Sequence, residues 1–313
     1  MIELLKAGPL TTVQDLGRMA WRDRGISRCG ALDDLALCQA NLLVGNDVGA
    51  AGLEFTLGPA LLRLQADGWL ALTGTDSPAA LDGQPVRPGW RTRVQAGQVL
   101  KIAAPRERMR TVLAVSGGID VPLALGSRST DLKAGFGGLN GRALRDGDQL
   151  PWHPPPVQHH AAPRQIGLRP PSWTAEVRVL PGPEHDQFTL QARQALFEAD
   201  WTLTPQSNRM GFRFAGPVLA RAAGGDLPSH GVLPGVIQVP PSGQPIVLLA
   251  DAQTTGGYPK IGVVIRADLW KLAQLRLGGT LRFLPCTREE AVAALRDREA
   301  ELDALKVALC LST

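Results

Sequence analysis

The chain has 313 residues, of which 44% are hydrophobic and 20% charged, a composition typical of globular rather than disordered proteins. Its length exceeds the usual size of a single hydrophobic core, so we expect two domains. The net charge of +4 comes from basic and acidic residues scattered along the chain. Without a basic run or basic–aromatic alternation, it argues against nucleic acid as a partner.

The cysteines and the apolar segments indicate a cytoplasmic protein. Cys29, Cys38, Cys286 and Cys310 have neither CxxC spacing nor the density of a disulfide framework. No apolar stretch approaches 18 residues, and the first residues lack a signal-peptide core, so we expect no membrane segment.

In the first half, apolar residues at helical spacing predict a helix from Leu32 to Leu43, ending at Gly45. The remaining apolar runs are short and separated by turn residues, which is typical of strands. The candidates are 61–65, 69–72, 99–102 and 111–115.

A proline-rich stretch at 151–172 divides the chain, because prolines disfavour both helix and sheet. It holds three of the five histidines: His153, His159 and His160. A metal site and a solvated linker are the two interpretations. The absence of a nearby cysteine or carboxylate pair favours the linker, so we predict no metal site.

The second half repeats the strand pattern. One helix is predicted near 184–199, and a last helix is predicted over 287–309, where Thr287 and Glu290 form a capping box. The predicted strands are 177–180, 236–239, 246–250, 262–265 and 280–283.

The chain therefore predicts a mainly β fold of two β-barrel domains, each with a short helix, plus a C-terminal helix. The expected ranges are 1–150 for the first domain, 151–172 for the linker and 173–313 for the second domain. Weak parallels between 56–59 and 214–217, and between 97–102 and 278–283, suggest a diverged internal repeat.

The densest group of reactive side chains is the decapeptide 251–260, which contains the only tyrosine. Two apolar runs flank it, so we expect a loop held by rigid strands, where functional groups are commonly placed. Asp251 could orient or deprotonate a ligand, Tyr258 could donate to a carbonyl, and Lys260 could pair with an oxyanion. A structural polar network is the alternative.

Other polar residues are candidates for binding or acid–base chemistry. His230 lies between Ser229 and Gly231, where an acid–base role competes with a structural one. Gln238 interrupts an apolar strand, so its amide needs either a ligand or neighbouring backbone. Arg128 and Arg209 have the donors that suit carboxylate or phosphate.

Several common motifs are missing from the sequence. It contains no P-loop, no HExxH, no G-x-S-x-G and no dinucleotide fingerprint. None of the four methionines adjoins a lysine, so we expect no biotin attachment site in this chain.

The chain resembles the KipA / allophanate hydrolase subunit 2 family of carboxyltransferase-like proteins, and most closely its 5-oxoprolinase branch. Ser-His-Gly at 229–231 favours that branch. The blocks that carry the resemblance are TTVQDLGR (11–18), GISRCGALD (25–33), ANLLVGND (40–47), LEFTLGP (53–59), AVSGGIDVP (114–122), GSRSTDLKAGFGGLNGR (126–142), LPGPEHDQF (180–188), SNRMGFR (207–213) and residues 229–265.

The resemblance implies two cyclophilin-like barrels in a heteromeric enzyme that opens the lactam of 5-oxo-L-proline to L-glutamate with ATP hydrolysis. It also implies a KipI-type (PxpB-type) partner and a LamB/YcsF-type (PxpA-type) partner, without which the chain is expected to be inactive. ATP belongs to the complex at an unassigned place. On this basis Asp251, Tyr258, Lys260 and His230 are predicted to be catalytic. The predicted substrate-binding residues are Gln238, Thr254, Thr255, Arg128 and Arg209.

Two other functions stay open at this point. One is half of a biotin-dependent carboxyltransferase acting on urea- or allophanate-type amides, which would need a biotinylated partner. The other is a non-catalytic KipA-like protein that binds and antagonises a KipI-type kinase inhibitor.

Overall fold

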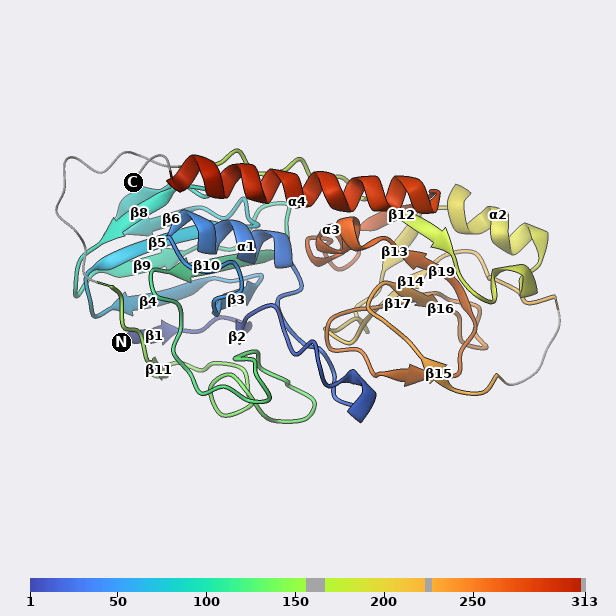
Figure 1. The fold of residues 1–313 in the computed structure, drawn as a ribbon, viewed down its shortest axis with the longest axis horizontal. Coiled ribbons are helices and arrows are strands. Elements are labelled where there is room, and N and C mark those ends of the chain that lie inside the picture. Colours follow the sequence, from blue (N-terminus) through green and yellow to red (C-terminus); the bar gives the residue numbers. More distant parts are fainter. Residues whose placement is uncertain (156–166, 223–226, 311–313) are drawn as a thin grey trace. The chain divides into compact units, whose positions relative to one another are not determined.

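The structure, a computed structural model, describes residues 1–155, 167–222 and 227–310 (Figure 1). The chain divides into two compact units. The first unit comprises residues 1–18, 29–172 and 300–313, and the second comprises residues 19–28 and 173–299.

These units differ from the expected ranges in three segments. The proline-rich stretch 151–172 belongs to the first unit, as do residues 300–313, whereas residues 19–28 belong to the second unit. His153 is exposed, and His159 and His160 lie outside the described residues.

The first unit contains two antiparallel sheets. Side chains from both sheets, including Leu62 from one and Leu53 and Leu72 from the other, form one hydrophobic core. The strands are β1 (Ile2–Lys6), β2 (Leu10–Gln14), β3 (Gly52–Thr56), β4 (Ala60–Leu64), β5 (Gly68–Thr73), β6 (Ala79–Leu81), β7 (Gln84–Val86), β8 (Arg91–Val94), β9 (Val99–Ile102), β10 (Arg110–Val115) and β11 (Gln149–Leu150). Their order is β11-β1-β4-β9-β6-β7 in the six-stranded sheet and β2-β3-β10-β5-β8 in the five-stranded sheet.

Helix α1 (Asp34–Leu43) lies against the five-stranded sheet and contacts β5 and β10 (Figure 1). It begins where the Asp33 carboxylate accepts a hydrogen bond from the backbone N–H of Ala36 at 2.9 Å, an N-cap. It ends just before Gly45, whose φ of 78° is left-handed. The helix predicted from the leucine spacing is therefore confirmed.

The second unit is built around a closed seven-stranded barrel. Its strands are β12 (Glu176–Pro181), β13 (Trp201–Leu203), β14 (Gly211–Ala215), β16 (Val236–Gln238), β17 (Ile246–Leu248), β19 (Lys260–Val264) and β20 (Thr280–Pro285), in the order β12-β19-β16-β17-β14-β13-β20. A parallel pairing of β12 with β20 closes the ring. Phe283 packs on Trp201 and Phe214, with ring centroids 6.2 and 5.9 Å apart.

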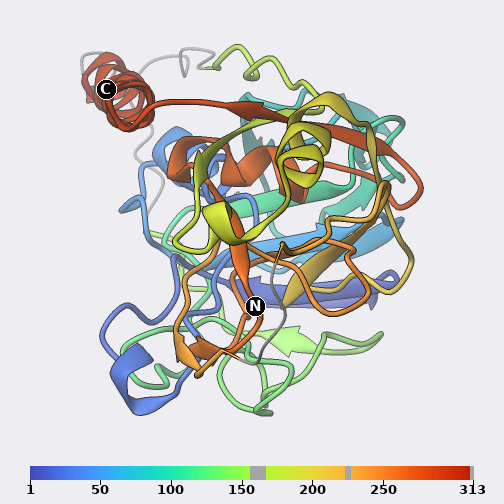
Figure 2. The same ribbon diagram turned by 90° about the vertical axis from the view of Figure 1, so that its right-hand side faces the viewer.

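Two short helices accompany the barrel (Figure 2). Helix α2 (Leu190–Glu198) contacts β20, and α3 (Leu269–Ala273) contacts β12. The Thr189 hydroxyl caps α2 by accepting from the N–H of Ala192 at 3.1 Å.

The C-terminal helix α4 (Arg288–Cys310) begins with the predicted capping box. The N–H of Thr287 donates to Glu290 at 2.8 Å, and the N–H of Glu290 donates to the Thr287 hydroxyl at 3.2 Å. Across the described ranges, no helix combines the length and apolar character needed to cross a bilayer. The mainly β fold with a closed barrel and a C-terminal helix is confirmed.

A two-stranded ribbon beside the barrel positions the candidate site. It consists of β15 (His230–Gly231) and β18 (Thr255–Gly256), which pair His230 with Gly256 and Gly231 with Thr255. In the barrel, a register shift between Ile237 and Gln238 pairs Gln238 with Lys260. Paired residues present their side chains on the same face, so the shift aligns this amide with this amine.

Candidate active site in the second unit

Lys260 is the first residue of β19 and is only 1% exposed. Burial disfavours the charged ammonium and lowers the pKa of Lys260, while the negative charge of Glu184 raises it in part. A lysine with a lowered pKa is suited to accept and release protons.

His230 connects Lys260 to Glu184. The Lys260 Nζ lies 3.3 Å from the His230 Nδ1, and the His230 Nε2 lies 3.8 Å from the Glu184 Oε1. If Nε2 carries the proton toward the carboxylate, Nδ1 is the acceptor and the lysine amine is the donor. The His230 side chain is 43% exposed, so this group of three, the Lys260–His230–Glu184 cluster, is open to solvent through its histidine.

The carboxylate of Glu184 is held in place by the backbone of Lys260. Its Oε2 accepts the N–H of Lys260 at 2.9 Å. Gly182 makes this approach possible, since a Cβ there would lie 2.2 Å from the Lys260 carbonyl oxygen. The cluster is therefore fixed by main-chain contacts as well as by side chains.

Gln238 adds an unused donor beside the amine. Gln238 is 2% exposed, and its Oε1 lies 3.5 Å from the donor Nε2 of Gln253. Its own Nε2 is buried and has no hydrogen-bond partner among the described residues. An unmet buried donor is costly, so this N–H suits an acceptor supplied by a ligand.

Asp251 and Arg209, predicted to be catalytic and substrate-binding, form a buried ion pair with each other. The Arg209 Nε and Nη2 donate to the two Asp251 carboxylate oxygens at 3.0 and 3.1 Å. The Asp251 N–H also donates to the Arg209 carbonyl at 3.1 Å. This two-point contact anchors the start of the decapeptide, and direct roles for either residue in chemistry stay predictions.

The other predicted residues are separated from the cluster. Tyr258 is 47% exposed and lines a hollow of about 560 Å³ with Pro240 and Pro259. Thr254 and Thr255 line a different cavity, described below. Arg128 belongs to the first unit, where its guanidinium donates to Asp120 at 2.8 Å, so its predicted role in binding substrate stays a prediction.

Sequence reasoning missed three residues around this site: Glu184, Gln253 and Arg22. Glu184 lies 76 positions before Lys260, and no local pattern joins them. Gln253 stands inside the decapeptide and could have been singled out as a second amide. Arg22 comes from the segment 19–28, which joins the second unit from the far end of the sequence.

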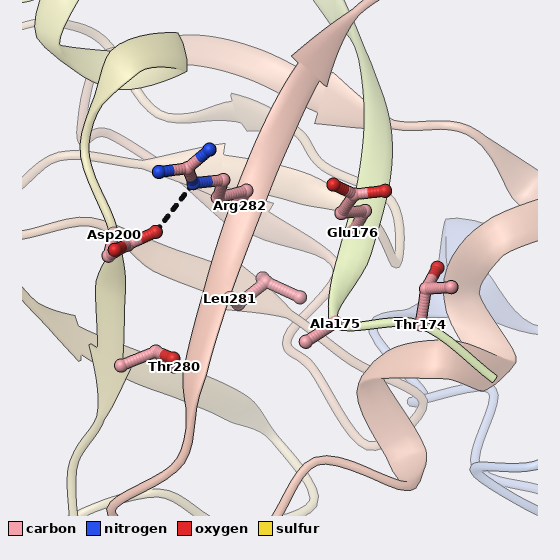
Figure 3. Close-up of a pocket in the computed structure, with 7 residues that line it drawn as sticks. All are labelled: Thr174, Ala175, Glu176, Asp200, Thr280, Leu281 and Arg282. Atoms are coloured by element: carbon pink, nitrogen blue, oxygen red, sulfur yellow. Dashed lines mark hydrogen bonds and ion pairs between the residues drawn. The ribbon is translucent and has the colours of Figure 1, made fainter.

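A separate hollow of about 390 Å³ lies where β12 and β20 run side by side (Figure 3). Its charged groups are Glu176 and the pair Asp200–Arg282, joined at 2.6 Å. Both members of the pair are more than half exposed, so the contact is a surface ion pair. Across the described residues, no group of three or more His, Cys, Asp or Glu is placed to hold a metal ion.

Residues 24–285 match the family model described as carboxyltransferase domain, subdomain A and B. The chain belongs to this carboxyltransferase family, and its relatives place it among the 5-oxoprolinase subunits designated C. It is 49% identical to the 5-oxoprolinase subunit of that designation from Escherichia coli K12, covering 97% of both chains. It is 43% identical to the protein of the same name from Haemophilus influenzae, covering 98% of both. The predicted resemblance is confirmed.

The solved structures give the same family. The crystal structure of the Kluyveromyces lactis Urea Carboxylase matches with a TM-score of 0.89 and 28% identity. The match covers 97% of this chain and 29% of that longer one.

Proposed function

We propose that this chain belongs to a heteromeric, ATP-dependent 5-oxoprolinase and provides acid–base groups for opening the lactam of 5-oxo-L-proline. The observation that carries the proposal is the Lys260–His230–Glu184 cluster beside the Gln238 amide, whose buried donor is unpartnered among the described residues. The likeness to proteins named as 5-oxoprolinase subunits supplies the substrate.

The reaction requires one water and two proton movements. The water oxygen bonds to the lactam carbonyl carbon, and the bond from that carbon to the ring nitrogen breaks. The attacking water must lose a proton, and the departing nitrogen must gain one to become the amino group of glutamate. Neutral Lys260 accepts the first proton, and His230 exchanges protons with solvent or with the nitrogen.

Gln238 fits the third requirement, which is a donor for the carbonyl oxygen. As the carbonyl carbon becomes tetrahedral, negative charge develops on that oxygen, and a buried N–H stabilises it. The Gln253 contact to the Gln238 Oε1 fixes which end of the amide is free to donate. The three functions are thus divided among an amine, an imidazole and an amide on one side of the barrel strands β16 and β19.

The partners and the nucleotide belong to the same proposal. A KipI-type subunit and a LamB/YcsF-type subunit would complete the enzyme. ATP would activate the lactam for ring opening. This sequence contains no P-loop, so no phosphate-binding role is assigned to its residues.

Reconstitution tests the proposal. The chain is mixed with the KipI-type and LamB/YcsF-type proteins of the same genome, and glutamate formed from 5-oxo-L-proline and ATP is measured. We expect activity only in the complete mixture, and loss of activity with Lys260→Met. Full activity without this chain, or without ATP, would contradict the proposal.

A second candidate function is supported by the match to the Kluyveromyces lactis Urea Carboxylase over 97% of this chain. In that case the chain would act with a biotinylated partner on a urea-type amide. Inhibition of the reconstituted activity by avidin, and carboxylation of urea or allophanate, would favour it. Glutamate production insensitive to avidin would favour the 5-oxoprolinase.

A further inference from the structure

A cavity of about 690 Å³ lies at the end of the β15–β18 ribbon. Ligand sites for small molecules commonly have volumes of this order. The cavity is lined by residues from two parts of the second unit: Arg22, Asp23, Gly25, Gly231, Val232, Leu233, Thr254 and Thr255.

Arg22 is the central charged group of this cavity. Its Nη2 donates to the carbonyls of Val232 and of Gln253, the latter at 3.4 Å. Its Nη1 is buried without a hydrogen-bond partner, and no carboxylate pairs with this arginine in the part of the chain that the structure describes. Burial also lowers the pKa of Arg22, although arginine keeps its charge at any physiological pH.

The other arginines predicted to bind an anion differ from Arg22 in this respect. Arg209 is bound at two points by Asp251, and Arg128 is bound by Asp120. The acid next to Arg22, Asp23, pairs with the exposed Arg24 at 3.4 Å. Arg22 is therefore a partly buried cation whose countercharge is missing from residues 1–155, 167–222 and 227–310.

The cavity adjoins the Lys260–His230–Glu184 cluster. Gly231, which lines it, directly follows His230 in β15, and Thr255, which also lines it, precedes the residue paired with His230. One residue of strand spans about 3.3 Å. A small ligand in the cavity thus lies within one strand residue of the imidazole-bearing position.

We propose that Arg22, with the hydroxyls of Thr254 and Thr255, binds the carboxylate of a small cyclic-amide acid, which presents its amide toward His230 and Lys260. A guanidinium matches a carboxylate at two points, and the two hydroxyls add donors. Val232 and Leu233 supply an apolar wall for ring methylenes. In 5-oxoproline, the carboxylate is joined to the reactive carbonyl through C2 and the ring nitrogen. This inference rests on the proposed function for the identity of the acid.

Binding to the full chain tests the site without activity. The chain is titrated by calorimetry with 5-oxo-L-proline, with 2-pyrrolidinone, which lacks the carboxylate, and with inorganic phosphate. We expect 5-oxoproline to bind at least about tenfold more tightly than the other two. Equal affinities, tighter phosphate binding, or no binding of 5-oxoproline would overturn the proposal.

Three variants localise the effect. Arg22→Gln should weaken 5-oxoproline binding by about tenfold or more and leave 2-pyrrolidinone unchanged, whereas Arg22→Lys, which keeps the charge, should retain part of the affinity. The matched control is Arg24→Gln, two residues away with a side chain 74% exposed, which should bind like the wild type. Circular dichroism confirms that each variant is folded.

Activity of the reconstituted complex separates this inference from the proposed function. If Arg22→Gln weakens binding but the wild-type complex forms no glutamate, the site survives and the proposed reaction falls. If the complex is active and Arg22→Gln leaves the KM for 5-oxoproline unchanged, the inference falls and the proposed reaction survives. A rise in KM with a nearly unchanged kcat supports both.

Discussion

The Lys260 Nζ and the His230 Nδ1 lie 3.3 Å apart, although 30 positions separate the two residues in the chain. Lys260 opens a barrel strand, and His230 opens a strand of the β15–β18 ribbon. Their contact joins a buried amine to an exposed imidazole, which provides a path for protons between the barrel and solvent.

Lys260→Met removes the amine and keeps much of the side-chain volume. We expect kcat for glutamate formation in the reconstituted complex to fall by about 10²–10⁴, the usual contribution of a proton-transfer group. Thermal stability should hold or rise, because a buried polar amine is replaced by an apolar chain. The control is Lys101→Met, an exposed lysine of β9, which should leave kcat unchanged. Equal kcat values for both variants would remove Lys260 from the mechanism.

Glu184→Gln is expected to alter the pH dependence. The active form in our proposal is the neutral amine, so activity rises as pH increases through the pKa of Lys260. Burial lowers that pKa and the charge of Glu184 raises it, so removing the charge lowers it further. The acid limb of the kcat profile should therefore move to lower pH. A limb that stays in place, or moves up, would contradict the assignment to Lys260.

Gly256→Ala tests the position of the Gln238 amide. A Cβ at Gly256 would lie 2.5 Å from the Gln238 Nε2, so the amide must turn away. We expect kcat to fall by about tenfold or more through loss of the donor, with a stability cost of about 1–3 kcal/mol. Gly231→Ala, in the opposite strand of the ribbon, has nothing within 4 Å of its added methyl group and should cost less in kcat. Similar kcat values in the two variants would exclude a role for Gln238.

The Asp251–Arg209 pair is expected to act mainly on stability. Both side chains are almost fully buried, so removing one partner leaves an unpaired charge. Asp251→Asn should lower the free energy of unfolding by about 3–5 kcal/mol in denaturant titrations. The double variant with Arg209→Met should recover part of this loss. Full additivity of the two single effects would show that the pair is not coupled.

Asp268 is expected to make stability depend on acid. Burial alone would raise its pKa, but hydrogen bonds from the Arg178 side chain and N–H lower it overall. A lowered pKa in the folded state means that the contribution is present above the ordinary pKa and is lost as pH falls through the folded one. Asp268→Asn should therefore flatten the acid side of the stability profile. An unchanged slope between the two proteins would argue against this source.

The sequence predicted more of the elements than of their arrangement. The leucine spacing before Gly45 and the capping box at Thr287 indicated α1 and the start of α4, because both signals are local. The division of the first unit into two sheets depends on pairings between distant strands. Such pairings leave no mark in a single segment.

The decapeptide 251–260 was predicted as one site, and the structure distributes it over three environments. Asp251 pairs with Arg209, Tyr258 lies in an exposed hollow, and Lys260 contacts His230. Composition alone identified the dense segment. Which of its members face the same side depends on the register shift at Gln238 and on contacts from Glu184, far away in the sequence.

The crossing of residues 19–28 into the second unit has a consequence for dissection of the protein. A fragment beginning at Trp173 would retain Lys260, His230 and Glu184 yet lack Arg22 and with it one side of the cavity at the end of the ribbon. The unit that carries the amine is thus assembled from two stretches of chain, and a cut at the proline-rich segment would separate the proposed proton-transfer groups from the proposed anchor for the substrate.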